Sequence, residues 1–92
     1  MSNQLEQIAK VCEAMKDLLV YKNKRYGNSA LAPLNIFSRL DSTNSIGVRL
    51  DDKLSRIKNS DSLRKNDVSD LIGYLVLLCV SKGWSDFSEF MD

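Results

Sequence analysis

The sequence predicts a small all-α domain, and three observations lead to this fold class. Apolar residues recur at three- and four-residue spacing, the period of an amphipathic helix. The alternation of apolar and polar residues that marks a half-buried strand persists nowhere in the sequence. The 92 residues, 43% hydrophobic and 27% charged, are enough for one globular domain with a thin core. We therefore expect a single helical domain over residues 1–92, a bundle of three main helices plus short connector and C-terminal helices, completed by homo-oligomerisation.

The first expected helix covers residues 3–22, with Ser2 or Asn3 as its cap. It is followed by the segment YKNKRYGNS, in which three cations and two tyrosines lead to Gly27, a residue typical of helix ends. Cations suit the C-terminus of a helix for electrostatic reasons alone. The tyrosines among them would equally suit a stacking platform for a base, with phosphate-binding side chains nearby. Both interpretations are open at this point.

Two further helices are expected in the middle of the chain. Pro33 can begin a short connector helix that ends near Leu40, and the polar residues 41–45 are expected to form a turn. Residues 46–58 then place apolar side chains on one helical face, and Lys53 lies within that face. Arg49 and Arg56 flank Lys53 along its edge. A lysine inside an apolar face needs a counter-charge, from the protein or from a ligand.

The last main helix is expected over residues 67–82, capped by Asn66 and ended by Gly83. Because it is apolar on nearly all sides, it should lie centrally or at a subunit interface. Gly73 in its middle predicts the close approach of another backbone. The tail is expected to dock as a short helix, on its own chain or on a neighbouring subunit, through aromatic and apolar side chains at helical spacing: Trp84, Phe87, Phe90 and Met91.

Composition excludes several classes of function. A net charge of +1 provides no basic field for non-specific binding to DNA or RNA. Because the chain has no histidine, catalytic triads with histidine and imidazole zinc sites are excluded. Cys12 and Cys79 lie in apolar helical faces, where we expect buried free thiols. The sequence shows neither a signal peptide nor an apolar run of membrane-spanning length, so we expect a cytoplasmic protein that is not bound to a membrane.

Asp67, Asp70 and Tyr74 share one side of the last main helix, at positions i, i+3 and i+7. If this helix packs antiparallel to the preceding one, its carboxylates can form structural ion pairs with the cations of residues 49–56. Alternatively, Asp67 and Asp70 coordinate a hard cation such as Mg²⁺, and the cations are left for phosphate oxygens. The residues alone leave both alternatives open.

Three motifs carry a resemblance to a known family. They are KNKRYGNS at residues 22–29, RLDDKLSR at 49–56 and DVSDLIGY at 67–74. Together they resemble the nucleotide modification associated domain family of phage and bacterial proteins. That family is similar to the MazG-like all-α nucleotide pyrophosphatases, in which paired acidic helices hold Mg²⁺ against nucleotide phosphates within an oligomeric bundle. By resemblance, Asp67 and Asp70 match the second acidic pair, and Lys22, Asn23 and Tyr26 match the turn motif. The first helix departs from the family, because its acidic residues are too dispersed for the usual metal-binding pair.

The resemblance implies a phage-type protein that holds a nucleotide or a cyclic-nucleotide-like signal in a pocket at a subunit interface, as an anti-defence sponge in the host cytoplasm. The expected ligand-binding residues are Lys22, Asn23, Arg25, Tyr26, Arg49, Lys53, Arg56 and Tyr74. Asp67 and Asp70 are the expected ligands for a Mg²⁺ ion. The alternatives are a Mg²⁺-dependent MazG-like nucleoside triphosphate pyrophosphatase, serving nucleotide metabolism or DNA modification, and a helical interaction module without a ligand.

Overall fold

The computed structural model describes residues 3–27 and 41–91, and both ranges are helical, as predicted. Helix α1 is Gln4–Tyr26, α2 is Ser42–Lys58 and α3 is Lys65–Lys82, and a short 3-10 helix, η1, covers Ser88–Phe90. These ranges contain no strand. The connector helix expected before residue 41 lies outside the described residues.

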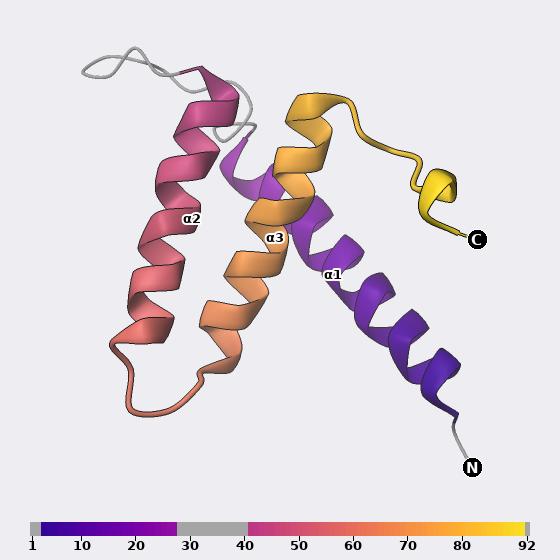
Figure 1. Cartoon of the computed structure of the whole chain (residues 1–92), viewed down its shortest axis with the longest axis horizontal. Helices are drawn as coiled ribbons and strands as arrows, with labels where there is room; N and C mark the ends of the chain where they lie inside the picture. The colour runs from indigo at the N-terminus through magenta and orange to yellow at the C-terminus, as the bar shows by residue number, and fades with distance from the viewer. Residues whose placement is uncertain (1–2, 28–40, 92) are drawn as a thin grey trace.

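Helix α3 lies between the other two helices (Figure 1). It runs antiparallel to α2, to which residues 59–64 connect it, and the two helices pack along most of their length. Helix α1 crosses α3 at an angle and touches it over a much shorter stretch. The central position of α3 agrees with the prediction from its apolar composition.

Helix α1 ends later than predicted. The Asn3 side chain caps its start, because Oδ1 accepts a hydrogen bond from the N–H of Glu6 at 2.8 Å. The predicted end at Lys22 is wrong, since the helix continues to Tyr26. Nothing between Lys22 and Tyr26 breaks a helix. The helix stops at Gly27, with a φ of 73°, which is the stop that the sequence indicated. The cationic, aromatic motif therefore lies on a helix rather than in a turn.

The starts of α2 and α3 also differ from the prediction. Residues 42–45, predicted as a turn, form the first turn of α2, because the Asp41 side chain accepts a hydrogen bond from the N–H of Asn44 at 2.7 Å. Helix α3 begins at Lys65, ahead of the predicted cap at Asn66, and its first residues have no side-chain cap. Its end at Gly83, in the left-handed conformation with a φ of 73°, is as predicted.

The core within one chain is small. Ile46 of α2 is the only fully buried apolar side chain among the described residues. At the crossing of α1 and α3, a β-carbon added to the buried Gly73 would lie 3.1 Å from a methyl carbon of Leu19. Gly73 therefore permits the close approach that the sequence predicted, although the neighbour is a side chain of α1 rather than its backbone.

Several apolar groups that were expected to be buried are exposed. The predicted docking of the tail is not found on its own chain, because the side chains of Trp84, Phe87, Phe90 and Met91 are exposed. Cys12 is exposed as well, which corrects its predicted burial, and Cys79 is half-buried; both are free thiols. Over residues 3–27 and 41–91, no helix is both long and apolar enough to span a bilayer.

Candidate functional site

A pocket of about 380 Å³ lies where α1 crosses α3. This volume is within the range of sites that bind small molecules. Its apolar wall comes from both helices and consists of Met15, Leu18, Leu19 and Leu77. Its polar lining consists of Lys22, Asn23, Tyr26, Ser69, Asp70 and Tyr74. Apolar walls with a few polar groups are the usual composition of a ligand pocket.

The helical period explains why α1 supplies both kinds of lining. Residues 15, 18, 19, 22, 23 and 26 form pairs three or four positions apart and therefore fall on one side of a helix with 3.6 residues per turn. The side is apolar as far as Leu19, where it packs on α3, and polar from Lys22 onward. Because α1 does not end until Tyr26, this polar part stays on the helix and faces the pocket.

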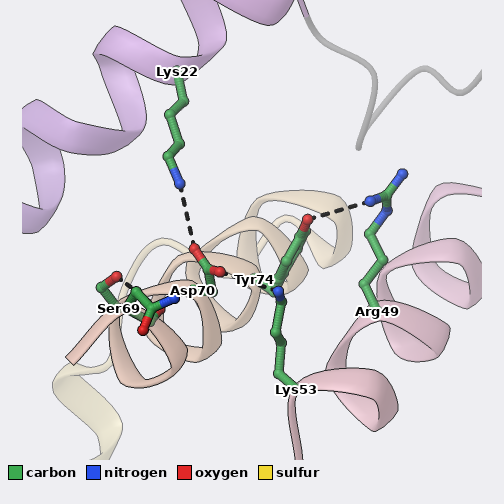
Figure 2. A network of polar contacts seen from close by, with 7 residues as sticks. Lys22, Arg49, Lys53, Ser69, Asp70 and Tyr74 are labelled. Atoms are coloured by element: carbon green, nitrogen blue, oxygen red, sulfur yellow. Dashed lines mark hydrogen bonds and ion pairs between the residues drawn. The ribbon is translucent and has the colours of Figure 1, made fainter. Parts of the chain in front are cut away.

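Asp70 connects all three helices. Its Oδ1 accepts a hydrogen bond from Lys22 Nζ of α1 at 3.3 Å, and its Oδ2 lies 3.1 Å from Lys53 Nζ of α2 (Figure 2). One carboxylate and two ammonium groups leave this cluster with one net positive charge. Lys53, which the sequence placed within an apolar face, is therefore paired with a carboxylate of the protein. This is the ion-pair alternative of the two that the sequence left open.

The two lysines determine the charge state of Asp70. Partial burial by itself raises the pKa of this carboxyl group, since it disfavours the charged form. Hydrogen bonds from Lys53 and Lys22, together with the charges of these lysines, act in the opposite direction and outweigh burial. The pKa of Asp70 is consequently lower than its ordinary value. At neutral pH the carboxylate is ionised and is a weak base.

Each of the two tyrosines of the pocket has an arginine beside it. Arg49 Nη1 donates a hydrogen bond to the hydroxyl oxygen of Tyr74 at 3.3 Å, and Arg49 Cζ lies 5.8 Å from the centre of the Tyr74 ring (Figure 2). Arg25 Cζ lies 5.7 Å from the centre of the Tyr26 ring. Both distances are within the range of cation–π contacts. Arg49 thus holds the Tyr74 ring in place from α2.

The expected ligand-binding residues fall into three groups. Those that line the pocket are Lys22, Asn23, Tyr26 and Tyr74. Those that contact a lining side chain are Arg25, Arg49 and Lys53. Arg56 is exposed and does not line the pocket. The apolar wall was not among the residues expected from the sequence. Its signal is the three- and four-residue spacing from Met15 to Tyr26, which places the wall and the polar lining on one side of α1 once the helix is taken to end at Tyr26.

The two aspartates expected to hold Mg²⁺ have different surroundings. Asp67 is buried, with 4% of its surface exposed, and does not line the pocket. Asp70 lines the pocket, but each of its oxygens contacts a lysine ammonium group, which competes with a cation for the same lone pairs. Within residues 3–27 and 41–91 there is no cluster of three or more metal-ligating side chains. The Mg²⁺ ion stays a prediction, and no chemical step is derived from it.

Comparison of the sequence with protein-family models, with curated proteins and with solved structures gives no match. The three motifs therefore stay a resemblance, and the geometry of the pocket carries the functional conclusion.

Proposed function

We propose that this chain binds a phosphorylated small molecule of nucleotide type in the pocket between α1 and α3. The observation that carries the proposal is the combination of two tyrosine rings and a lysine ammonium group in the lining of one pocket with an apolar wall. Aromatic faces bind bases by stacking, and ammonium groups bind phosphate oxygens.

Lys22 is the side chain that binds phosphate in this proposal. Its contact with Asp70, at 3.3 Å, is longer than a typical charge-assisted hydrogen bond of about 2.7–2.9 Å. Its side chain is 46% exposed, whereas that of Lys53 is 15% exposed. A phosphate can therefore take Lys22 from Asp70 while Lys53 continues to neutralise the carboxylate. Asp70 keeps Lys22 near the pocket when the ligand is absent.

The tyrosines and Asn23 bind the base in this proposal. A base that stacks on a tyrosine ring gains about 1–3 kcal/mol, with little dependence on its identity. The Asn23 amide offers both donors and an acceptor to the polar edge of a base. The leucines and Met15 supply an apolar surface against which the base excludes water. These contacts would distinguish a nucleotide from inorganic phosphate.

The proposal is for binding without turnover. Among the described residues that line the pocket, Asp70 is the only carboxylate. Two lysines lower its pKa, so it is a weak general base. We therefore expect a site with this composition to bind its ligand without hydrolysing it. The resemblance of the three motifs supports the finer proposal that the ligand is a nucleotide or cyclic-nucleotide signal and that its capture counters host signalling in the cytoplasm.

A recovery experiment tests the proposal. The protein is incubated with a panel of linear and cyclic nucleotides, with and without Mg²⁺, separated from unbound ligand, and denatured by heat. Chromatography of the supernatant then identifies what was bound. We expect unchanged nucleotide. Release of monophosphate and pyrophosphate would replace the proposal with the pyrophosphatase, and recovery of no nucleotide from any mixture would leave the interaction module.

A further inference from the structure

The apolar face of α1 is only half covered within one chain. Toward its C-terminus, Met15, Leu18 and Leu19 are half-buried where α1 crosses α3. Toward its N-terminus the same face continues with Leu5, Ile8 and Val11, whose exposed fractions are 75%, 53% and 57%. These three residues, with the exposed Cys12, are called the α1 stripe. Figure 1 shows this half of α1 projecting away from α2 and α3.

The surface of the chain is too large for a compact monomer. A monomeric protein of 10.4 kDa exposes about 5,400 Å², whereas this chain exposes 7708 Å². Its radius of gyration is 15.1 Å, against about 12 Å for a compact domain of this length. The difference, roughly 2,300 Å² over the whole chain, is larger than the about 800 Å² that each partner buries in a standard interface. A second copy that packs on the α1 stripe would need to cover only part of this surface.

The charges of α1 favour a second copy over a charged partner. Steps of about 100° per residue place Glu6, Lys10 and Glu13 on the side of α1 opposite to the stripe. Most positions that border the stripe are neutral: Gln4, Gln7, Ala9 and Ala14. Lys16, one turn after Cys12, is exposed and paired with Glu13 at 2.7 Å. In a two-fold interface each surface meets its own equivalent, so a charged stripe would bring like charges together. This stripe is uncharged and can pack on itself without burying a charge.

We infer that two copies of this chain associate through the α1 stripe and form a two-fold dimer. The homo-oligomer expected from the thin core thereby acquires a defined interface, with Ile8 at its centre. The inference is independent of the nucleotide proposal, because the α1 stripe and the pocket occupy different halves of α1. The dimer could therefore be confirmed in a protein that binds no nucleotide, and nucleotide binding could be confirmed in a protein that forms no dimer.

Light scattering coupled to size-exclusion chromatography measures the mass of the assembly directly. For the wild type we expect at least twice the mass of one chain. Ile8→Lys, which places a charge in the α1 stripe, should reduce that mass by half or more. The matched control is Asp17→Lys, which introduces the same residue on the exposed opposite side of the helix and should leave the mass unchanged. A wild type with the mass of one chain, or an Ile8→Lys variant with the wild-type mass, would overturn the inference.

Labelling of Cys12 provides a second measurement that does not depend on the folding of a variant. The thiol is exposed in one chain and would be covered in the dimer. We expect its reaction with a maleimide to slow as the wild-type protein is concentrated and to become fast again on dilution. Protection that does not change with dilution, in a protein of single-chain mass, would show that the same chain covers the stripe and would exclude the second copy.

Discussion

The two lysines that share Asp70 differ in their surroundings and should differ in their roles. Lys53 is enclosed between α2 and α3, so its bond to Asp70 contributes to the fold. Lys22 is nearly half exposed and reaches Asp70 from α1 (Figure 2). Exposed ion pairs contribute little to stability, about 0–1 kcal/mol. Lys22 is therefore available to a ligand at small cost to the fold.

Lys22→Ala should weaken nucleotide binding and leave stability almost unchanged. A charge-assisted hydrogen bond to phosphate contributes about 1.5–3 kcal/mol, which corresponds to a loss of affinity of roughly 10- to 150-fold. Isothermal titration calorimetry with a nucleotide recovered from the wild type measures the change. Lys24→Ala, an exposed position of the same helix outside the pocket lining, is the matched control. Equal affinities of the two variants would remove Lys22 from the site.

Asp70→Asn should destabilise the fold by about 1–3 kcal/mol, because it leaves the enclosed Lys53 without its counter-charge. Denaturation in urea measures the change. Asp61→Asn, which removes a carboxylate from the exposed loop between α2 and α3, should change stability by no more than about 0.5 kcal/mol. If both substitutions had the same small effect, the contact of Asp70 with Lys53 would not contribute to the fold.

The stabilising effect of Asp70 should disappear in acid. Since the pKa of Asp70 is lower in the folded chain than in the unfolded chain, its contribution is complete above the unfolded pKa, near 3.8, and is lost as the pH falls through the folded pKa. The difference in free energy of unfolding between wild type and Asp70→Asn should be constant between about pH 7 and pH 5 and shrink below about pH 4. A difference that grows on acidification would contradict this assignment.

At the scale of helices, periodicity was sufficient to predict the three main helices and the central position of α3. It did not locate the ends. At the end of α1 and the start of α2, polar residues that also suit turns continue the helix, because the decisive groups are Gly27 and the Asp41 side chain. The pocket was not predictable for a related reason. It requires α1 to extend past Lys22 and to cross α3 at Gly73. The sequence indicated a close approach at Gly73, but it did not show which helix approaches there.

Substitutions at two helical glycines test where α1 crosses α3. Gly47 in α2 has open space where a β-carbon would lie, so Gly47→Ala should stabilise the chain by about 0.5–1 kcal/mol through helix propensity. At Gly73 the added carbon would lie 3.1 Å from Leu19, so Gly73→Ala should gain less or destabilise, and should weaken ligand binding as α1 is displaced. Thermal unfolding compares the two. Equal stabilisation by both substitutions would show that α1 does not approach α3 at Gly73.

At the scale of the whole molecule, α1 joins two regions for which we propose different roles. Its C-terminal half supplies the lysine, amide and tyrosine of the pocket, and its N-terminal half carries the α1 stripe. The core of one chain is small, with Ile46 as its fully buried apolar side chain among the described residues, and it leaves apolar surface exposed that the inferred second copy would partly cover. The thin core was predictable from chain length, whereas the location of the uncovered surface required the arrangement of the helices.

The most direct test of the nucleotide proposal is to map the ligand onto the chain by NMR. With ¹⁵N-labelled protein, titration with a nucleotide recovered from the wild type should shift the amide signals of Lys22, Asn23 and Gly73 first and most strongly, because these residues surround the pocket from both helices. Shifts confined to the outer side of α2, or no shifts at saturating nucleotide, would contradict binding between α1 and α3.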